Sequence, residues 1–186
     1  MSGGALPLRV ILGAGDQRWP GWQPTQRSEL DLLDPDTFAR FFGGRQADAF
    51  LCEHVWEHLE PGEGRQAARL VARYLNPGGF LRVAVPDGHH PEPSYQALVA
   101  PGGPGPAADH RVLYTLETFA PLFTAAGLKV RPLEWWDRSG TFHRAEWQPA
   151  DAPVYRSSHL DHRNESWRQG RGPLGFTSLV LDAVRP

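Results

Sequence analysis

Residues 51–64 read LCEHVWEHLEPGEG and place His54, Glu57 and His58 in the pattern H-x-x-E-H. Two histidines four positions apart lie on one face of an α-helix, where they can share a zinc ion with a glutamate beside them. Such a site would perform metal-dependent hydrolysis. This interpretation requires both histidines to lie inside one helix, so the elements around the motif decide whether it holds.

The sequence around this motif argues against such a helix. Residues 49–52 form a short apolar run that predicts a buried strand, which puts His54 at the end of that strand. Pro61 and Gly62 indicate that the next helix begins only after His58. We therefore predict no zinc ion shared by His54 and His58. Instead, His58 is expected to pack or cap at a junction between a loop and a helix.

A glycine turn is the second candidate site. Residues 8–12 predict a buried strand, and Gly13, Ala14 and Gly15 follow it directly. At the carboxyl edge of a parallel sheet, a turn of this kind brings backbone N–H groups close to a ligand. The same three residues could equally form a plain turn that binds nothing.

A third candidate site follows the strand predicted at residues 80–85. Asp87, His89 and, further on, His110 come after it, and polar groups at the carboxyl end of a parallel strand lie where ligands bind. An aspartate or histidine there could accept a proton from a nucleophile. The alternative is a solvated loop without a chemical role. The polar tail at residues 159–178 could cover a pocket mouth or bind an anionic group, or it could equally be a surface loop.

The elements that position these residues alternate between strands and helices. An apolar helix face follows the expected N-cap Asp34 and ends at Gly43. Further helices are predicted at 63–75 and 115–126, and a long loop rich in proline and glycine at 86–110. This alternation is typical of a parallel α/β sheet, with strands expected at 8–12, 22–26, 49–52, 80–85, 128–136 and 176–184.

Length and composition indicate one soluble domain that spans residues 1–186. Hydrophobic residues make up 40% and charged residues 22% of the 186 residues. A net charge of -2 provides no electrostatic footprint for nucleic acid or an anionic membrane. The single Cys52 excludes internal disulfides. Residues 1–7 lack the features of a signal peptide, and no window is apolar enough for a membrane helix, so we expect a cytoplasmic protein.

Several segments together resemble a known family. In this order the chain carries VILGAGDQRWPGW, DLLD, AFLCEHVWEHL and ARYLNPGGFLRVAVPDG, followed by HRVLYTLETFAPLFTAAG, FHRAEW and LDHRN. Their order and spacing resemble the short bacterial predicted S-adenosylmethionine-dependent methyltransferases, compact relatives of the methyltransferase type 11 group. In that family the segment that contains H-x-x-E-H follows the fourth strand of the sheet and lines the cofactor pocket.

The resemblance implies a Rossmann-like, mostly parallel sheet of seven strands, trimmed in its first half, with the last strand antiparallel. It also implies S-adenosylmethionine as the cofactor. Backbone N–H groups of the glycine turn would hold the methionine part, and Asp87 would face the substrate. The residues implied in cofactor binding are Gly13, Ala14 and Gly15 at the methionine part, Asp31 and Leu32 near the adenine, and Glu53 and His54 on the far side of the cofactor.

Two departures from the family pattern bear on activity. The acidic residue that binds the ribose hydroxyls aligns with Gln26, which makes a neutral hydrogen bond in place of a charge-assisted one. Glu29 could replace it if the loop bends. The link between the first two strands is also too short for the usual helix.

The resemblance favours methyl transfer from S-adenosylmethionine to an unidentified small-molecule acceptor. Asp87, His89 and His110 are the candidate bases, and residues 98–108 could form a lid. The runner-up is a catalytically silent binding module of the same fold, which Gln26 and the missing helix favour. A zinc-dependent hydrolase built on His54 and His58 is third.

Overall fold

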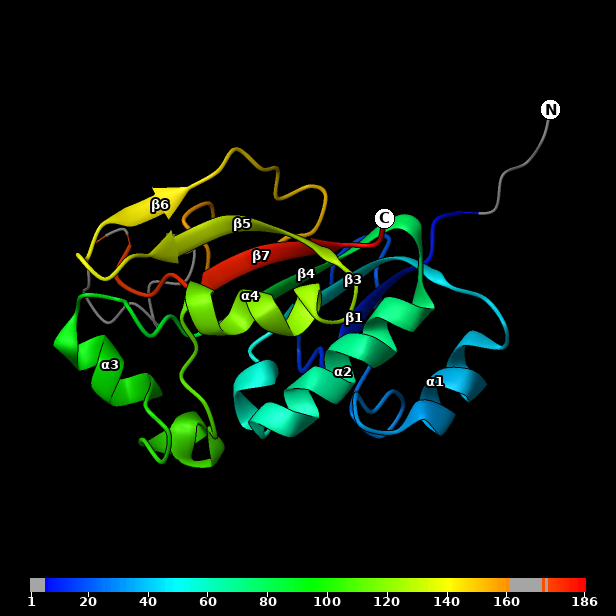
Figure 1. Ribbon diagram of the computed structural model, residues 1–186, viewed down its shortest axis with the longest axis horizontal. Helices are drawn as coiled ribbons and strands as arrows, with labels where there is room; N and C mark the ends of the chain where they lie inside the picture. The colour runs from blue at the N-terminus through cyan, green and yellow to red at the C-terminus, as the bar shows by residue number, and fades with distance from the viewer. Residues whose placement is uncertain (1–5, 161–171, 173) are drawn as a thin grey trace.

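A computed structural model describes residues 6–160, 172 and 174–186; most of the predicted polar tail, residues 161–171 and 173, lies outside them. Its centre is one seven-stranded sheet with the strand order β2-β1-β3-β4-β7-β5-β6 (Figure 1). The strands are β1 (Arg9–Leu12), β2 (Gln23–Pro24), β3 (Ala47–Glu53), β4 (Leu75–Val85), β5 (Lys129–Trp136), β6 (Phe142–Arg144) and β7 (Leu179–Val184).

Strand direction confirms the predicted fold class. β1 pairs in parallel with β2 and β3, and β3 pairs in parallel with β4. β7 is antiparallel to both of its neighbours, β4 and β5, which confirms the predicted antiparallel last strand. β6 is antiparallel to β5. Strands β1 to β5 therefore run in one direction and β6 and β7 in the other.

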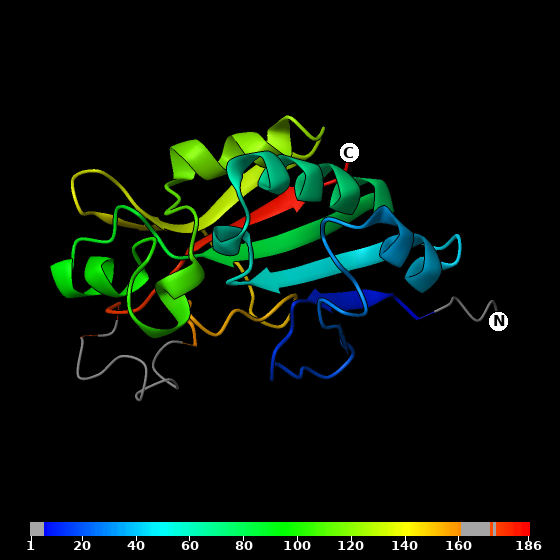
Figure 2. The same cartoon turned by 90° about the horizontal axis from the view of Figure 1, so that it is seen from below.

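Helices α1 (Pro35–Phe42), α2 (Pro61–Tyr74) and α4 (Leu116–Thr124) cover one face of the sheet (Figure 2). Their ends follow from the sequence, as predicted for α1. The Asp34 carboxylate accepts a hydrogen bond from the N–H of Asp36, and Gly43 closes the helix with a φ of 55°. Phe38, Phe42 and other fully buried side chains of these helices pack into the main core against the sheet.

The opposite face has a different cover. Residues 145–160, which we call the covering segment, contain no helix or strand, yet they bury Trp147, Ala152 and Val154 against this face. Trp22, from the link between β1 and β2, packs into the same cluster. This link contains no helix, so the predicted trimming of the first half is present.

Buried charges from three strands hold the covering segment in place. Arg82 of β4 forms a two-pronged ion pair with Asp182 of β7, with N–O distances of 2.8 and 2.9 Å. Its remaining nitrogen donates to the carbonyl oxygens of Gln148 and Ala152 in the covering segment. The guanidinium also lies 4.7 Å from the ring centre of Trp147. Arg82 thus joins the sheet to its cover.

Glu134 and Glu53 act in the same way from β5 and β3. Glu134 accepts hydrogen bonds from the backbone N–H and hydroxyl of Ser158 and from the indole of Trp147. Glu53 accepts from the backbone N–H groups of Tyr155 and Arg156. An irregular segment can be buried only if its polar backbone groups find partners, and these side chains supply them.

Several predicted element boundaries differ from the structure. β2 contains only two residues, although Thr25 continues the contact with β1 by donating its N–H to the carbonyl oxygen of Ile11 and accepting from the N–H of Ala14. β4 begins at Leu75 instead of Phe80, since backbone bonds between residues 78–79 and Arg185 continue the pairing. β7 begins at Leu179 instead of Phe176, because residues 174–177 form a turn.

The predicted loop at 86–110 is partly helical. It contains α3 (Pro93–Val99) and a short 3-10 helix, η2 (Gly105–Asp109). Glu92 caps α3 and Pro93 occupies its first turn, a start signal that the high proline and glycine content of the segment obscured. Tyr95 and Val99 are buried, so α3 packs against the rest of the protein.

None of the helices among the described residues combines the length and the apolar character that a bilayer crossing demands.

Replacing Arg82 tests its role in attaching the covering segment. Arg82→Leu leaves the buried Asp182 carboxylate and two carbonyl oxygens without a donor, so we expect a loss of about 3–5 kcal/mol in the free energy of unfolding. Adding Asp182→Leu to that variant should recover most of the loss, because the unpaired charge is removed. Urea denaturation measures both changes.

The matched control is Arg69→Leu, which removes an exposed arginine from α2. It should change the free energy of unfolding by less than about 0.5 kcal/mol. If Arg82→Leu costs no more than this control, Arg82 does not anchor the covering segment.

Candidate functional site

A pocket of about 280 Å³ lies where the parallel strands β1, β2 and β3 end. Gly13 follows β1, residues 27–32 follow β2, and residues 54–59 follow β3. Ligands of open α/β sheets bind beyond the carboxyl ends of the strands. The lining is apolar at Leu30, Leu32, Val55 and Leu59 and polar at Arg27, Asp31, His54, His58 and Asp109. Four of the predicted cofactor-binding residues, Gly13, Asp31, Leu32 and His54, meet in this pocket.

Gly13 is required at the pocket wall for two reasons. Its φ of 60° is a left-handed conformation that favours glycine. A Cβ at this position would lie 2.7 Å from Cγ2 of Val55, which is too close for any side chain. The turn after β1 therefore lets its backbone approach the segment after β3.

The other residues of the predicted glycine turn face elsewhere. The N–H of Ala14 donates to the carbonyl oxygen of Thr25 at 2.8 Å. The Ala14 side chain is buried on the other face of the sheet, in the cluster that contains Trp147 and Ala152 of the covering segment. The carbonyl oxygen of Gly15 accepts from the side chains of Arg18 and Gln26. The Ala14 N–H and the Gly15 carbonyl oxygen are therefore bonded within the fold. Gly13 is the residue of the turn that lines the pocket.

Gln26, predicted to take the ribose position, does not line the pocket. Its side-chain amide donates to Gly15 at 2.8 Å, and its backbone N–H donates to the Glu29 carboxylate at 2.8 Å. Asp31 is the carboxylate at this end of the pocket instead. One of its oxygens accepts from the N–H of Leu33, and the other pairs with Arg27 at 3.0 Å.

Glu53 lies behind the pocket rather than in its wall. Beyond its two bonds to the covering segment, it accepts from the side chain of Gln17 at 2.6 Å. Burial raises the pKa of this carboxyl group, although the donors around it oppose the shift. The Glu53 carboxylate thus binds the backbone of Tyr155 and Arg156 and does not line the pocket.

His54 has the most unusual backbone conformation in the site. It has a φ of 57°, which is uncommon for a residue other than glycine, and this turns the chain out of β3 toward the pocket. Its ring nitrogens lie 2.8 Å from the Ser178 hydroxyl and 2.9 Å from the Arg156 guanidinium. Burial, with the Arg156 charge next, lowers the pKa of His54 well below its usual value, so the ring is neutral.

Glu57 is fully buried beside this histidine. Its Oε1 lies 3.0 Å from Nδ1 of His54, but without hydrogen-bond geometry. Burial raises the pKa of Glu57 to about 8, and the neutral His54 offers it no positive charge. The contact between them is therefore not an ion pair at neutral pH.

The predicted absence of a helical zinc motif at His54 and His58 agrees with the backbone. Residues Trp56–His58 form a 3-10 helix, η1, and α2 begins only at Pro61. His54 precedes η1 in a left-handed conformation, so the two histidines do not lie one turn apart on an α-helix. His58 lies at the junction between η1 and α2, where the sequence places it, and also lines the pocket.

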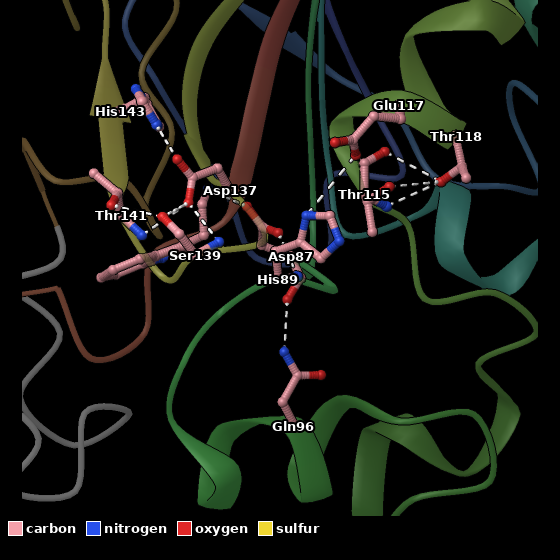
Figure 3. A network of polar contacts seen from close by, with 11 residues as sticks. Asp87, His89, Gln96, Thr115, Glu117, Thr118, Asp137, Ser139, Thr141 and His143 are labelled. Carbon is pink, nitrogen blue, oxygen red and sulfur yellow. Dashed lines mark hydrogen bonds and ion pairs between the residues drawn. The ribbon is translucent and has the colours of Figure 1, made fainter.

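Asp87 is buried between α3, β5 and the segment before α4 (Figure 3). Its carboxylate accepts from the backbone N–H groups of His89 and Trp136, both at 2.8 Å. The side chain of Gln96 donates to its carbonyl oxygen. Burial raises the pKa of Asp87 to about 6 against these bonds. Asp87 is an anchor between β4 and β5 and lies apart from the pocket.

His89 lies beside Asp87, and its Nδ1 is 3.8 Å from the Glu117 carboxylate (Figure 3). His110 lies elsewhere, next to the pocket. Its Nδ1 donates to the carbonyl oxygen of Val99 at 2.8 Å, and its ring centre is 4.7 Å from that of His58. Of the three predicted bases, only His110 touches a residue of the pocket wall.

The sequence patterns did not point to Arg27, Leu30, Val55 or Leu59 as site residues. Val55 and Leu59 belong to the segment after β3, whose place at the strand end was a usable signal. Asp109 comes from the end of η2, more than fifty residues further along the chain, and no local pattern predicts that approach.

The sequence matches no protein-family model and no curated protein. Solved structures do match. An O-methyltransferase family protein from Burkholderia thailandensis is 15% identical with a TM-score of 0.54, over 96% of this chain and 51% of that one. A chain of the complex between the Haloferax volcanii Trm112 methyltransferase activator and a methyltransferase is 15% identical with a TM-score of 0.53, over 97% of this chain and 83% of that one.

An S-adenosylmethionine-dependent methyltransferase from Thermotoga maritima is 12% identical with a TM-score of 0.52, over 96% of this chain and 82% of that one. The chain spans about half the length of the Burkholderia protein. At such identities the likeness establishes the fold, which is the Rossmann-like fold of S-adenosylmethionine-dependent methyltransferases. The assignment to the type 11 group stays a prediction.

The raised pKa of Asp87 predicts a particular dependence of stability on pH. The protonated form is favoured in the folded protein, so the contribution of Asp87 is fully present below pH 4 and is lost as the pH rises through 6. The shift from 3.8 to about 6 corresponds to at most about 3 kcal/mol. Asn mimics the protonated form, so Asp87→Asn should gain stability relative to the wild type between pH 4 and pH 7.

Urea denaturation at several pH values measures this difference, and the exposed Asp151→Asn reports the background of removing one carboxylate. A difference between wild type and Asp87→Asn that stays constant with pH, or changes in the opposite direction, would contradict the burial argument.

Proposed function

We propose that this protein binds S-adenosylmethionine in the pocket beyond β1, β2 and β3 and transfers its methyl group to a small-molecule acceptor. The observation that carries this proposal is the convergence of Gly13, Asp31, Leu32 and His54 on one pocket in a sheet of the methyltransferase type. The three strands place these residues together although they are up to 41 positions apart in sequence.

The residues present fit the nucleoside end of the cofactor. Leu30, Leu32 and Leu59 provide apolar walls for a planar base, and Asp31 lies among them as a carboxylate acceptor. One oxygen of Asp31 is fixed by the N–H of Leu33, which orients the group before a ligand arrives. A preoriented carboxylate can accept charge-neutral donors such as ribose hydroxyl groups at low entropic cost.

The fit to the methionine end is weaker. Ala14, expected there, donates its N–H to Thr25 within the fold. Glu53, expected on the far side of the cofactor, also has its carboxylate bound within the fold. Gly13 is the member of the turn that remains at the pocket wall. We therefore assign the binding energy mainly to the nucleoside end.

When bound, S-adenosylmethionine supplies an activated methyl group on a sulfonium centre. The chain then has to hold the acceptor close and in line, and exclude water. Acceptor activation belongs to the side of the pocket formed by His58, Asp109 and the adjacent His110, because Asp87 and His89 lie apart from it.

A second candidate is a binding module that transfers no methyl group. It is favoured by one observation: the carboxylates of Glu53 and Asp87, both expected to face cofactor or substrate, accept backbone hydrogen bonds instead. This alternative retains cofactor binding and lacks turnover.

Calorimetric titration with S-adenosylhomocysteine tests cofactor binding. Wild type should bind with micromolar affinity. Leu59→Trp should weaken binding by at least about tenfold, because the larger side chain fills a pocket of this size. Leu70→Trp is the matched control, since Leu70 is also a half-buried leucine but lies on α2 away from the pocket. It should bind like the wild type.

No binding at millimolar ligand by the folded wild type would refute the proposed pocket. Equal loss in both leucine variants would also count against it. Formation of S-adenosylhomocysteine from S-adenosylmethionine, measured with a panel of small phenols, amines and carboxylic acids, separates the two candidates. The methyltransferase predicts turnover with at least one acceptor class, and the binding module predicts binding without turnover.

A further inference from the structure

We propose that Glu57, His58 and His110 form a binding site for a divalent transition-metal ion, best matched by Zn²⁺, at the edge of the pocket. One potential ligand atom from each residue lies within 4.8 Å of the others. Ligand atoms on one tetrahedral zinc ion are about 3.3 Å apart, so small side-chain movements would bring the three into range. The site borders the proposed cofactor pocket, but its test does not depend on the proposed function.

Glu57 provides the strongest independent reason to expect an ion. Its side chain is fully buried, and neither of its carboxylate oxygens has a hydrogen-bond donor. Buried carboxylates are normally hydrogen-bonded, paired with a charge or bound to a metal. The contact with His54 does not meet this need, because it lacks hydrogen-bond geometry.

The two histidines are oriented as metal ligands commonly are. Nδ1 of His110 donates to the carbonyl oxygen of Val99 at 2.8 Å, and this bond fixes the tautomer that leaves Nε2 as an electron-pair donor. Nδ1 of His58 is buried without a hydrogen bond, although Oδ1 of Asp109 lies 3.0 Å away. Asp109 is thus close to His58, but it is exposed and does not belong to the cluster of three potential ligands.

The composition of the site selects the class of ion. Two imidazoles and a carboxylate suit Zn²⁺, Co²⁺ or Ni²⁺, whereas Mg²⁺ and Ca²⁺ prefer oxygen ligands alone. His54 does not belong to this set, because the Arg156 guanidinium lies 2.9 Å from its Nδ1. The site thus uses the second histidine of H-x-x-E-H and the glutamate before it, together with His110 from after η2.

The position of the ion gives it two consequences. It would tie η1, which follows β3, to the end of η2, and so fix the part of the 86–110 segment that borders the pocket. His58 and Asp109 line the pocket, so a coordination position not taken by protein would lie near a bound molecule. In this arrangement His110 is a metal ligand, and the ion would lower the pKa of an acceptor hydroxyl bound to it, so that the proton could pass to water.

The test uses the full chain without a His-tag, freed of metal by dialysis against a chelator. Titration with ZnCl₂ should show one equivalent bound at micromolar affinity or tighter. Co²⁺ should give the intense visible absorption of a tetrahedral site. Glu57→Gln and His110→Ala should each weaken Zn²⁺ binding by at least about tenfold. His143→Ala is the matched control, because His143 pairs with a carboxylate, Asp137, outside the cluster, and should bind like the wild type.

Thermal unfolding with and without Zn²⁺ provides a second measurement on the same proteins. The ion should raise the melting temperature of wild type and His143→Ala but not of Glu57→Gln or His110→Ala. Wild type that binds no Zn²⁺ at millimolar concentration overturns the proposal. Unchanged affinity in the folded Glu57→Gln and His110→Ala proteins overturns it as well, because the ion would then bind elsewhere.

Discussion

The structure depends on the burial of charged side chains beneath the covering segment. One face of the sheet has helices, and the other has only an irregular chain whose backbone must be satisfied. Arg82, Glu134 and Glu53 meet this demand from three different strands. Because each buried charge binds backbone groups as well as side chains, the covering segment is fixed along its length. The covering segment thus buries the second face of the sheet without a helix, although the link between β1 and β2 contains none.

This arrangement also determines where the pocket lies. Glu53 ends β3 and is held from behind by the covering segment, so the chain must turn sharply at the next residue. His54 makes that turn in a left-handed conformation. Gly13, at the end of β1, has no side chain and so leaves space for Val55, the next residue. The segment that follows, with Glu57 and His58, is thereby directed over the carboxyl ends of the parallel strands. The end of β3 therefore both holds the covering segment, through Glu53, and begins the segment that lines the pocket.

Much of the fold could be predicted from local patterns. Apolar runs locate β1, β3 and β4, and the cap at Asp34 with the stop at Gly43 defines α1. The order of these elements, with the resemblance, indicated a sheet of the methyltransferase type. α3 was missed because its start signal, Glu92 and Pro93, lies in a segment whose composition is typical of loops.

The candidate site was only partly predictable. Gly13 and His54 follow strands directly and Asp31 lies in the segment after β2, so sheet topology brings them together. Glu53 ends β3 and Asp87 comes after β4, but several of their partners lie far along the chain, and no spacing reveals which way such a carboxylate turns. The approach of Asp109 and His110 to His58 has the same origin in tertiary packing. Sequence patterns find strand ends, and long-range contacts decide what those ends face.

The central claim is that the pocket beyond β1, β2 and β3 holds the cofactor. Backbone amide NMR spectra recorded during titration with S-adenosylhomocysteine test this claim residue by residue. A ligand bound in this pocket should cause saturable shifts at Gly13, Leu32 and Val55, and none at the separate pocket formed by Trp22 and His159. Shifts confined to that second pocket, or none at all, would contradict it.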